Sequence, residues 1–137
     1  MNTPVLWPML VLIFWTFGIG FLAALRRVRE ISSRRIPLAS IARPRDIANV
    51  LEDTQVMDNF NNLLQAPLLF YVWCLAMTQW QAAGGLWELG AWAYVGLRLG
   101  HSVIQITHNR VMQRFGVWVC SNAVLAALWV ALGWQRL

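Results

Sequence analysis

Three polar side chains in an otherwise apolar segment, residues 87–107, are the first candidates for chemistry. Arg98, His101 and Gln105 are separated by three, four and seven residues, so a helix would place them on one face. An arginine at the centre of a membrane span costs about 2.5–3.5 kcal/mol on the translocon scale, so such residues usually face a partner helix or a cavity. The segment therefore predicts a polar face directed into a helical bundle.

Two amides in the preceding apolar segment, residues 60–81, are expected to meet that face. At a rise of about 1.5 Å per residue, Asn62 and Gln65 would lie about 5–10 Å inside the membrane, at the depth of the polar face described above. Arg114, at the beginning of a fourth apolar segment, would add a guanidinium and the positive end of a helix dipole at the cytoplasmic rim. We predict a pocket between helices that attracts anions and opens to the cytoplasm.

Two other interpretations compete with a ligand site. Arg98 could pair within the bundle and His101 could be a hydrogen-bonded interior residue, but several polar groups converging at one depth favour a ligand. A haem or metal centre would need more donors. His101 and His108 are the only histidines, and no carboxylate stands at ligand spacing on the same face, so no metal is expected.

The composition predicts an all-α membrane protein. Hydrophobic residues make up 58% of 137 positions and charged residues only 12%. A membrane span needs about 20 apolar residues. Four stretches of this kind are present, at residues 5–25, 60–81, 87–107 and 115–134. With no internal repeat and no linker in view, residues 1–137 are expected to form a single domain, a four-helix transmembrane bundle.

The arginines predict the orientation of this bundle. The sequence has no lysine, and seven of its eleven arginines lie between Arg26 and Arg45. By the positive-inside rule, this first connection and the third, with Arg110 and Arg114, face the cytoplasm, and both termini face outward. We expect a multi-pass protein of a bacterial inner membrane. The basic stretch is explained by orientation and by anionic membrane lipid, so no nucleic-acid partner is expected.

Proline and glycine mark the predicted connections. The first helix should end near Pro37, and an interfacial helix should begin at Pro44 and lead into the second span. Pro67, inside that span, should bend it. Gly84 and Gly85 should form a short outward turn, which makes the second and third spans antiparallel neighbours.

Two motifs carry a resemblance to a known family. Residues 59–71, NFNNLLQAPLLFY, resemble the second-helix signature of the MAPEG family, the membrane-associated proteins in eicosanoid and glutathione metabolism. The third-helix motif of its prokaryotic branch is similar to Leu97-Arg98, His101-Ser102, Ile104, Thr107, Asn109, Val111 and Arg114. The match covers most of the chain, including the four spans and the long first connection.

The resemblance implies a homotrimer of four-helix subunits that binds glutathione between neighbours near the cytoplasmic face, with lipophilic electrophiles arriving from the bilayer. The glutathione-binding residues that it implies are Asn62, Gln65, Arg98, His101 and Gln105. Arg114 takes the position assigned to the thiol, and Arg26, Arg27 or Arg29 would supply a first-helix arginine. The implied activity is that of a glutathione transferase or peroxidase.

The implied chemistry needs a thiolate. The pKa of a free thiol is about 8.5, and a neighbouring guanidinium stabilises the deprotonated form, which is the role that Arg114 would play. Gln65 stands where the family has a glutamate that holds the ammonium of glutathione. Asp58 replaces the arginine of eicosanoid-making members, and Gln105 replaces a tyrosine.

These departures keep a second hypothesis open, a noncatalytic membrane trimer that binds lipid or a partner protein. A third, a small multidrug exporter, would need a carboxylate within a span, and the first span has none.

Overall fold

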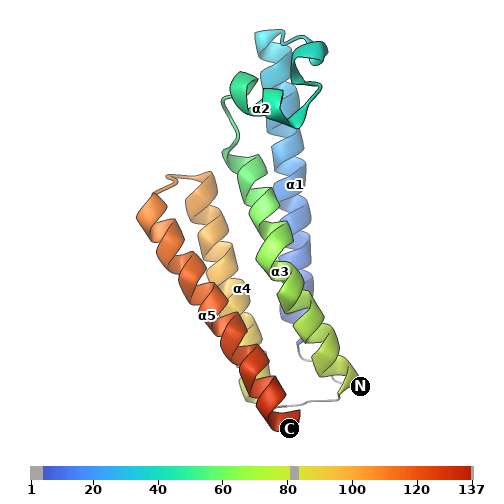
Figure 1. Ribbon diagram of the computed structural model, residues 1–137, viewed down its shortest axis with the longest axis vertical. Coiled ribbons are helices and arrows are strands. Elements are labelled where there is room, and N and C mark those ends of the chain that lie inside the picture. Colours follow the sequence, from blue (N-terminus) through green and yellow to red (C-terminus); the bar gives the residue numbers. More distant parts are fainter. Residues whose placement is uncertain (1–4, 81–83, 137) are drawn as a thin grey trace.

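The computed structural model describes residues 5–80 and 84–136. Its elements in chain order are α1 (Leu6–Arg34), a 3-10 turn η1 (Leu38–Ile41), α2 (Pro44–Val50), α3 (Gln55–Gln79), α4 (Gly85–Ile106) and α5 (Val111–Arg136). Four of these helices are long and run side by side along the molecule (Figure 1). The predicted all-α four-helix architecture is confirmed.

Three of the long helices, α1, α3 and α5, are long and apolar enough to cross a membrane. α4 has the length, 22 residues, but Glu88, Arg98 and His101 lower its hydropathy. The helices also extend beyond the predicted spans, because α1 continues past Leu25 to Arg34 and α3 begins at Gln55. The predicted end of the second span, residue 81, lies outside the described residues.

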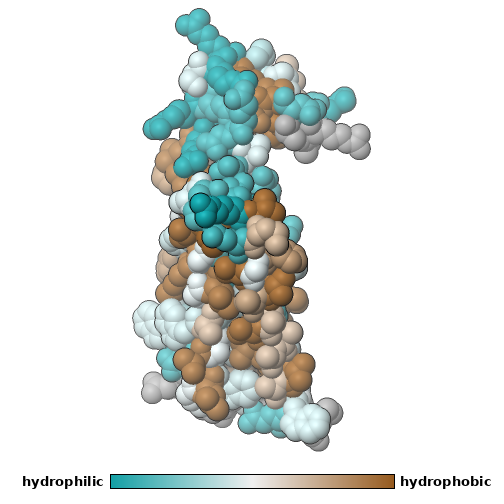
Figure 2. Space-filling view, turned by 90° about the vertical axis from the view of Figure 1, so that its left-hand side faces the viewer, coloured by the Kyte–Doolittle hydropathy of each residue, from teal (hydrophilic) through white to brown (hydrophobic). Residues whose placement is uncertain are grey.

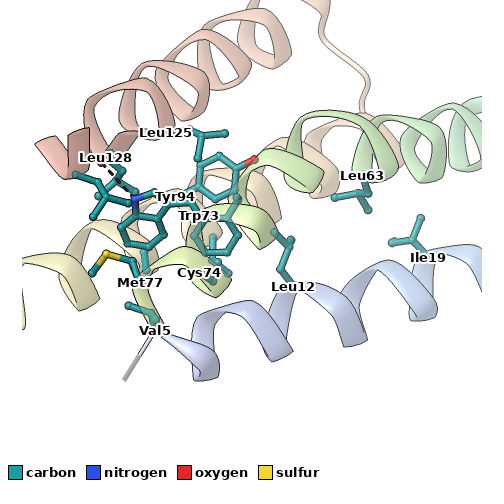
Figure 3. Packing of buried hydrophobic residues seen from close by; sticks show 14 of the residues in the cluster. Val5, Leu12, Ile19, Leu63, Trp73, Cys74, Met77, Tyr94, Leu125 and Leu128 are labelled. Atoms are coloured by element: carbon teal, nitrogen blue, oxygen red, sulfur yellow. Dashed lines mark hydrogen bonds between the residues drawn. The ribbon is translucent and has the colours of Figure 1, made fainter. Parts of the chain in front are cut away.

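The four long helices form two pairs, α1 with α3 and α4 with α5, and α4 also packs against α1 and α3 (Figure 1). Trp73 on α3 lies at the centre of the apolar core, near Met77, Tyr94 and Leu128 (Figure 3). Its indole Nε1–H donates to the carbonyl oxygen of Leu128 at 3.2 Å. The ring of Phe70 lies 4.6 Å from that of Tyr94, measured between centroids. Aromatic packing therefore ties α3 to α4 and α5.

The two ends of the bundle differ in polarity. The start of α1 and the end of α5 lie together at one end, and the first connection and the α4–α5 turn lie toward the other (Figure 1). Hydrophilic surface is concentrated around the first connection, whereas apolar surface covers much of the rod (Figure 2). The predicted orientation in the membrane requires the first connection and the α4–α5 turn to lie toward the same end of the bundle, as they do here.

The first connection is tied to α1 by one carboxylate. The Glu30 carboxylate accepts hydrogen bonds from the backbone nitrogen of Glu52 at 2.8 Å and from that of Asp53 at 3.3 Å. It also accepts a hydrogen bond from Arg34 Nη1 at 2.6 Å. Glu30 lies in the polar extension of α1 beyond its apolar part. The backbone donor of Glu52, followed by the other donors, lowers the pKa of Glu30 below its ordinary value of 4.5. We call this group the Glu30 clasp.

Proline and glycine lie at the helix starts where the sequence predicted them. α2 begins at Pro44, as expected for the interfacial helix, with Pro44 in its first turn. α3 continues as a helix through the buried Pro67, although proline has no N–H to donate to the Leu63 carbonyl. Gly84, at φ 153°, adopts a backbone conformation that favours glycine directly before α4.

Candidate functional site

A row of polar side chains runs along the contact between α3 and α4. Asn62 donates its Nδ2–H to Gln105 Oε1 at 3.1 Å, and Arg98 Nη2 approaches the backbone oxygen of Asn62 at 3.5 Å. One turn earlier on α3, Asn59 donates to Ser102 Oγ at 2.5 Å. We call these five residues the polar seam. The structure therefore brings together Asn62, Arg98 and Gln105, as the sequence predicted.

The first helix joins the seam through Trp15. Its indole Nε1–H donates to Ser102 Oγ at 2.8 Å, so one hydroxyl receives donors from α1 and α3. The sequence prediction missed Trp15 as a partner of this network. It also gave no structural role to Asn59 and Ser102, although Asn59 precedes Asn62 by three residues and Ser102 adjoins His101. That helical spacing was the available signal.

Arg98 is a buried cation in this seam, with only 1% of its surface exposed. Its guanidinium carbon lies 5.9 Å from the centroid of the Tyr94 ring, which allows a cation–π contact. Among residues 5–80 and 84–136, its Nε has no hydrogen-bond partner and no carboxylate forms an ion pair with it. The positive charge of Arg98 is therefore not neutralised within the described part of the protomer.

A pocket of about 200 Å³ opens beside the seam, between α3, α4 and α5. Its lining residues are Asn62, His101, Val111, Arg114, Phe115 and Trp118. His101 is buried, and its imidazole lies within electrostatic range of both the Arg98 and the Arg114 guanidinium groups. We call this the Arg114 pocket. Its described lining includes one guanidinium, that of Arg114, and no carboxylate, and the Arg98 guanidinium lies nearby beside His101, so positive charge predominates around the pocket.

Arg114 is oriented by the turn between α4 and α5. Its Nη1 donates to Asn109 Oδ1 at 2.7 Å, and the side chain is half-buried. Asn109 has φ 45°, in the left-handed region that asparagine tolerates better than most residues. The turn therefore fixes one edge of the guanidinium and leaves the rest of the group at the pocket.

The other predicted residues take different places. Gln65 is exposed on the outside of α3 and does not line the Arg114 pocket, whereas Gln105 is buried behind Asn62. Of the candidate first-helix arginines, Arg26 pairs with Asp53 at 3.4 Å and Arg27 lines a different pocket. None of the arginines of α1 lines the Arg114 pocket.

That different pocket has a volume of about 340 Å³ and lies between α1, α2 and the start of α3. Its lining residues are Ala23, Arg27, Ile47, Leu51, Asp53, Thr54, Met57, Asp58 and Asn61. We call it the interfacial pocket, because it lies where the apolar part of α1 gives way to its arginines. It has no lining residue in common with the Arg114 pocket.

Comparison with known proteins identifies the family. The family model described as MAPEG family matches residues 5–134, which include all four long helices except the last residues of α5. Searches of curated proteins and of solved structures gave no match. Since the family model covers nearly the whole sequence, and three helices are apolar enough to span a bilayer, the chain is an integral membrane protein that belongs to the MAPEG family.

Proposed function

We propose that the protein is a glutathione-dependent transferase or peroxidase that acts on lipophilic electrophiles. The observation that carries this proposal is the Arg114 pocket, in which Asn62, His101 and Arg114 face one cavity from three helices. The family membership supports this class of chemistry. The pocket supplies the positive charge that a thiolate and the carboxylates of glutathione require.

The pocket residues suit glutathione in part. Arg114 and the nearby Arg98 attract its carboxylates and its thiolate, and Asn62 and His101 provide polar atoms for the peptide groups. The ammonium finds no carboxylate among the lining residues, and Gln65 offers only a neutral amide on the outer face of α3. We therefore expect weaker binding than in members that have a glutamate at this position.

Glutathione would supply the nucleophilic sulfur. In conjugation a carbon–sulfur bond forms while the leaving group departs with its electron pair; in peroxide reduction two glutathiones become one disulfide as a hydroperoxide becomes an alcohol and water. Arg114 holds the negative charge of the sulfur at the rim. Val111, Phe115 and Trp118 form an apolar wall on α5 for the electrophile. No nucleophile from the protein is needed.

We also propose a homotrimer whose neighbouring subunit completes the site. The Arg114 pocket, at about 200 Å³, is smaller than the roughly 300–1,000 Å³ of typical ligand pockets, so a tripeptide would extend beyond it. Gln65, an exposed amide within an apolar helix, would be covered by the neighbour. The arginine distribution supports a bacterial inner membrane location with both termini outward.

A noncatalytic membrane trimer that binds lipid or a partner protein is the second candidate. The observation that favours it is the position of Gln65, which is both neutral and outside the pocket. The engagement of Arg114 by Asn109 also removes one of the guanidinium edges available to a thiolate.

Calorimetry and an activity assay on the detergent-purified protein separate the two candidates. We expect saturable glutathione binding and conjugation of a standard aromatic halide, both reduced at least about tenfold by Arg114→Ala, the loss of one charge-assisted contact. Arg110→Ala is the matched control, since Arg110 is exposed and does not line the pocket. No binding to the wild type, together with conjugation no faster than the protein-free rate for both the wild type and Arg114→Ala, would favour the noncatalytic protein.

A further inference from the structure

The interfacial pocket has a different chemical character from the Arg114 pocket. It holds one arginine and two aspartates, and Asp53 is already paired with Arg26 at 3.4 Å. Within the described residues, Arg27 and Asp58 form no ion pair with each other or with any other side chain at 4.0 Å or less. The pocket therefore presents one free positive and one free negative charge, on α1 and α3, to whatever lies between them.

The other lining residues indicate the depth at which this pocket lies in the membrane. Ala23, Ile47, Leu51 and Met57 provide an apolar surface, and Thr54 and Asn61 are neutral polar groups. Ala23 belongs to the apolar part of α1, and Arg27 follows it by one helical turn. In a bilayer this step from apolar to basic residues marks the head-group level.

We propose that the interfacial pocket binds the head group of a phospholipid that carries both a phosphate and a primary ammonium, the phosphatidylethanolamine class. The Arg27 guanidinium receives the phosphate, the Asp58 carboxylate receives the ammonium, and the apolar lining contacts the glycerol and the first methylenes. A zwitterion of this kind neutralises both free charges at once. An anionic lipid would leave Asp58 unpaired and repelled.

The walls of the pocket are held in place before any ligand binds. The Glu30 clasp fixes the backbone of Glu52 and Asp53 to α1, and the Arg26–Asp53 ion pair closes the same side. Binding then needs little ordering of the chain, which favours affinity. Glutathione is a poor occupant, because its two carboxylates would meet Asp53 and Asp58, and Arg27 is the one free cation among the described lining residues.

Native mass spectrometry of the full-length protein released from nanodiscs tests this assignment. The nanodiscs contain equal amounts of phosphatidylethanolamine, phosphatidylcholine and phosphatidylglycerol with the same acyl chains. We expect phosphatidylethanolamine to be retained about tenfold over the other two, since a trimethylated ammonium cannot donate to Asp58 and a glycerol head group has no cation. Arg27→Gln and Asp58→Asn should each abolish the preference.

Matched controls distinguish lost recognition from damage to the fold. Arg29→Gln and Asp46→Asn remove the same charges outside the lining and should keep the preference, as should the charge-conserving Arg27→Lys and Asp58→Glu. Equal retention of the three lipids by the wild type would overturn the proposal. So would an unchanged preference in both pocket variants, or displacement of the bound lipid by glutathione. Conjugation activity is not a readout, so the proposed enzymatic function stands or fails separately.

Discussion

Replacing Ser102 with alanine should loosen the contact among α1, α3 and α4. Ser102 Oγ accepts the indole N–H of Trp15 at 2.8 Å and the amide N–H of Asn59 at 2.5 Å. Ser102 and Asn59 have no exposed surface, so water cannot replace the lost acceptor without entering the bundle. The alanine variant leaves both donors without this partner.

The size of the effect follows from the two bonds. Side-chain hydrogen bonds between membrane helices contribute about 0.6 kcal/mol each on average and about 1.7 kcal/mol at most. Because the substitution removes one oxygen and no carbon, little apolar contact is lost, and the hydrogen-bond contribution dominates. We expect Ser102→Ala to lower the free energy of unfolding by about 1–3 kcal/mol.

A double-mutant cycle with Trp15→Phe isolates one of the bonds. The free energy of unfolding is measured in mild detergent for the wild type, the two single variants and the double variant. Ser102→Ala should cost about 0.6 kcal/mol less in the Trp15→Phe background, where one donor is already absent. Ser121→Ala is the control, since Ser121 is equally buried but, among the residues that the structure describes, its hydroxyl donates only to the Trp118 carbonyl of its own helix. Full additivity, or an equal loss in the Ser121 variant, would refute the inferred network.

Three further predictions concern separate parts of the molecule. Gln65→Glu should raise glutathione affinity about tenfold in calorimetry, because a carboxylate binds an ammonium more strongly than an amide does, and unchanged affinity would place Gln65 away from the ligand in the assembly as well. Trp73→Ala should lower the free energy of unfolding by about 3–5 kcal/mol, against little change for Trp134→Ala, whose side chain is 82% exposed; similar losses would contradict the core described above. Since folding lowers the pKa of Glu30, its clasp should contribute fully above about pH 4.5 and less as the pH falls through the lowered value, and the same acid sensitivity in Glu30→Gln would argue against it.

The polar face of α4 could be predicted from the sequence because its polar residues recur at the spacing of an α-helix. Arg98, His101 and Gln105 repeat at helical spacing in an apolar background, and all three are buried toward the bundle in the structure. Charged and amide groups in a span have few places to lie other than inside the protein. The family motifs indicated which residues of other helices to expect nearby. The inward direction of this face follows from the helical spacing and from the cost of exposing polar groups to lipid.

Gln65 shows where the same reasoning stops. Its depth in the second span, like that of Asn62, predicts a place in the same site, yet the buried stripe of α3 is centred on Asn59, Leu63 and Phe70. At about 100° per residue, Asn62 lies about 100° from Leu63, at the edge of the stripe, whereas Gln65 lies about 160° away on the opposite face. Locating that stripe requires the packing partners of α3, which the sequence alone does not specify.

The consecutive residues Asn61 and Asn62 also show that the sequence alone does not specify which helices a polar side chain faces. In the sequence they form one polar run and indicate one site. In the structure Asn61 lines the interfacial pocket with α1, whereas Asn62 lines the Arg114 pocket with α4 and α5. α3 thus separates two pockets of different electrostatic character: the described lining of one has an arginine and two aspartates, and that of the other has an arginine and no carboxylate. Asp58 therefore belongs with Arg27 and a zwitterion, and its presence does not weaken the anion-attracting pocket beside Asn62.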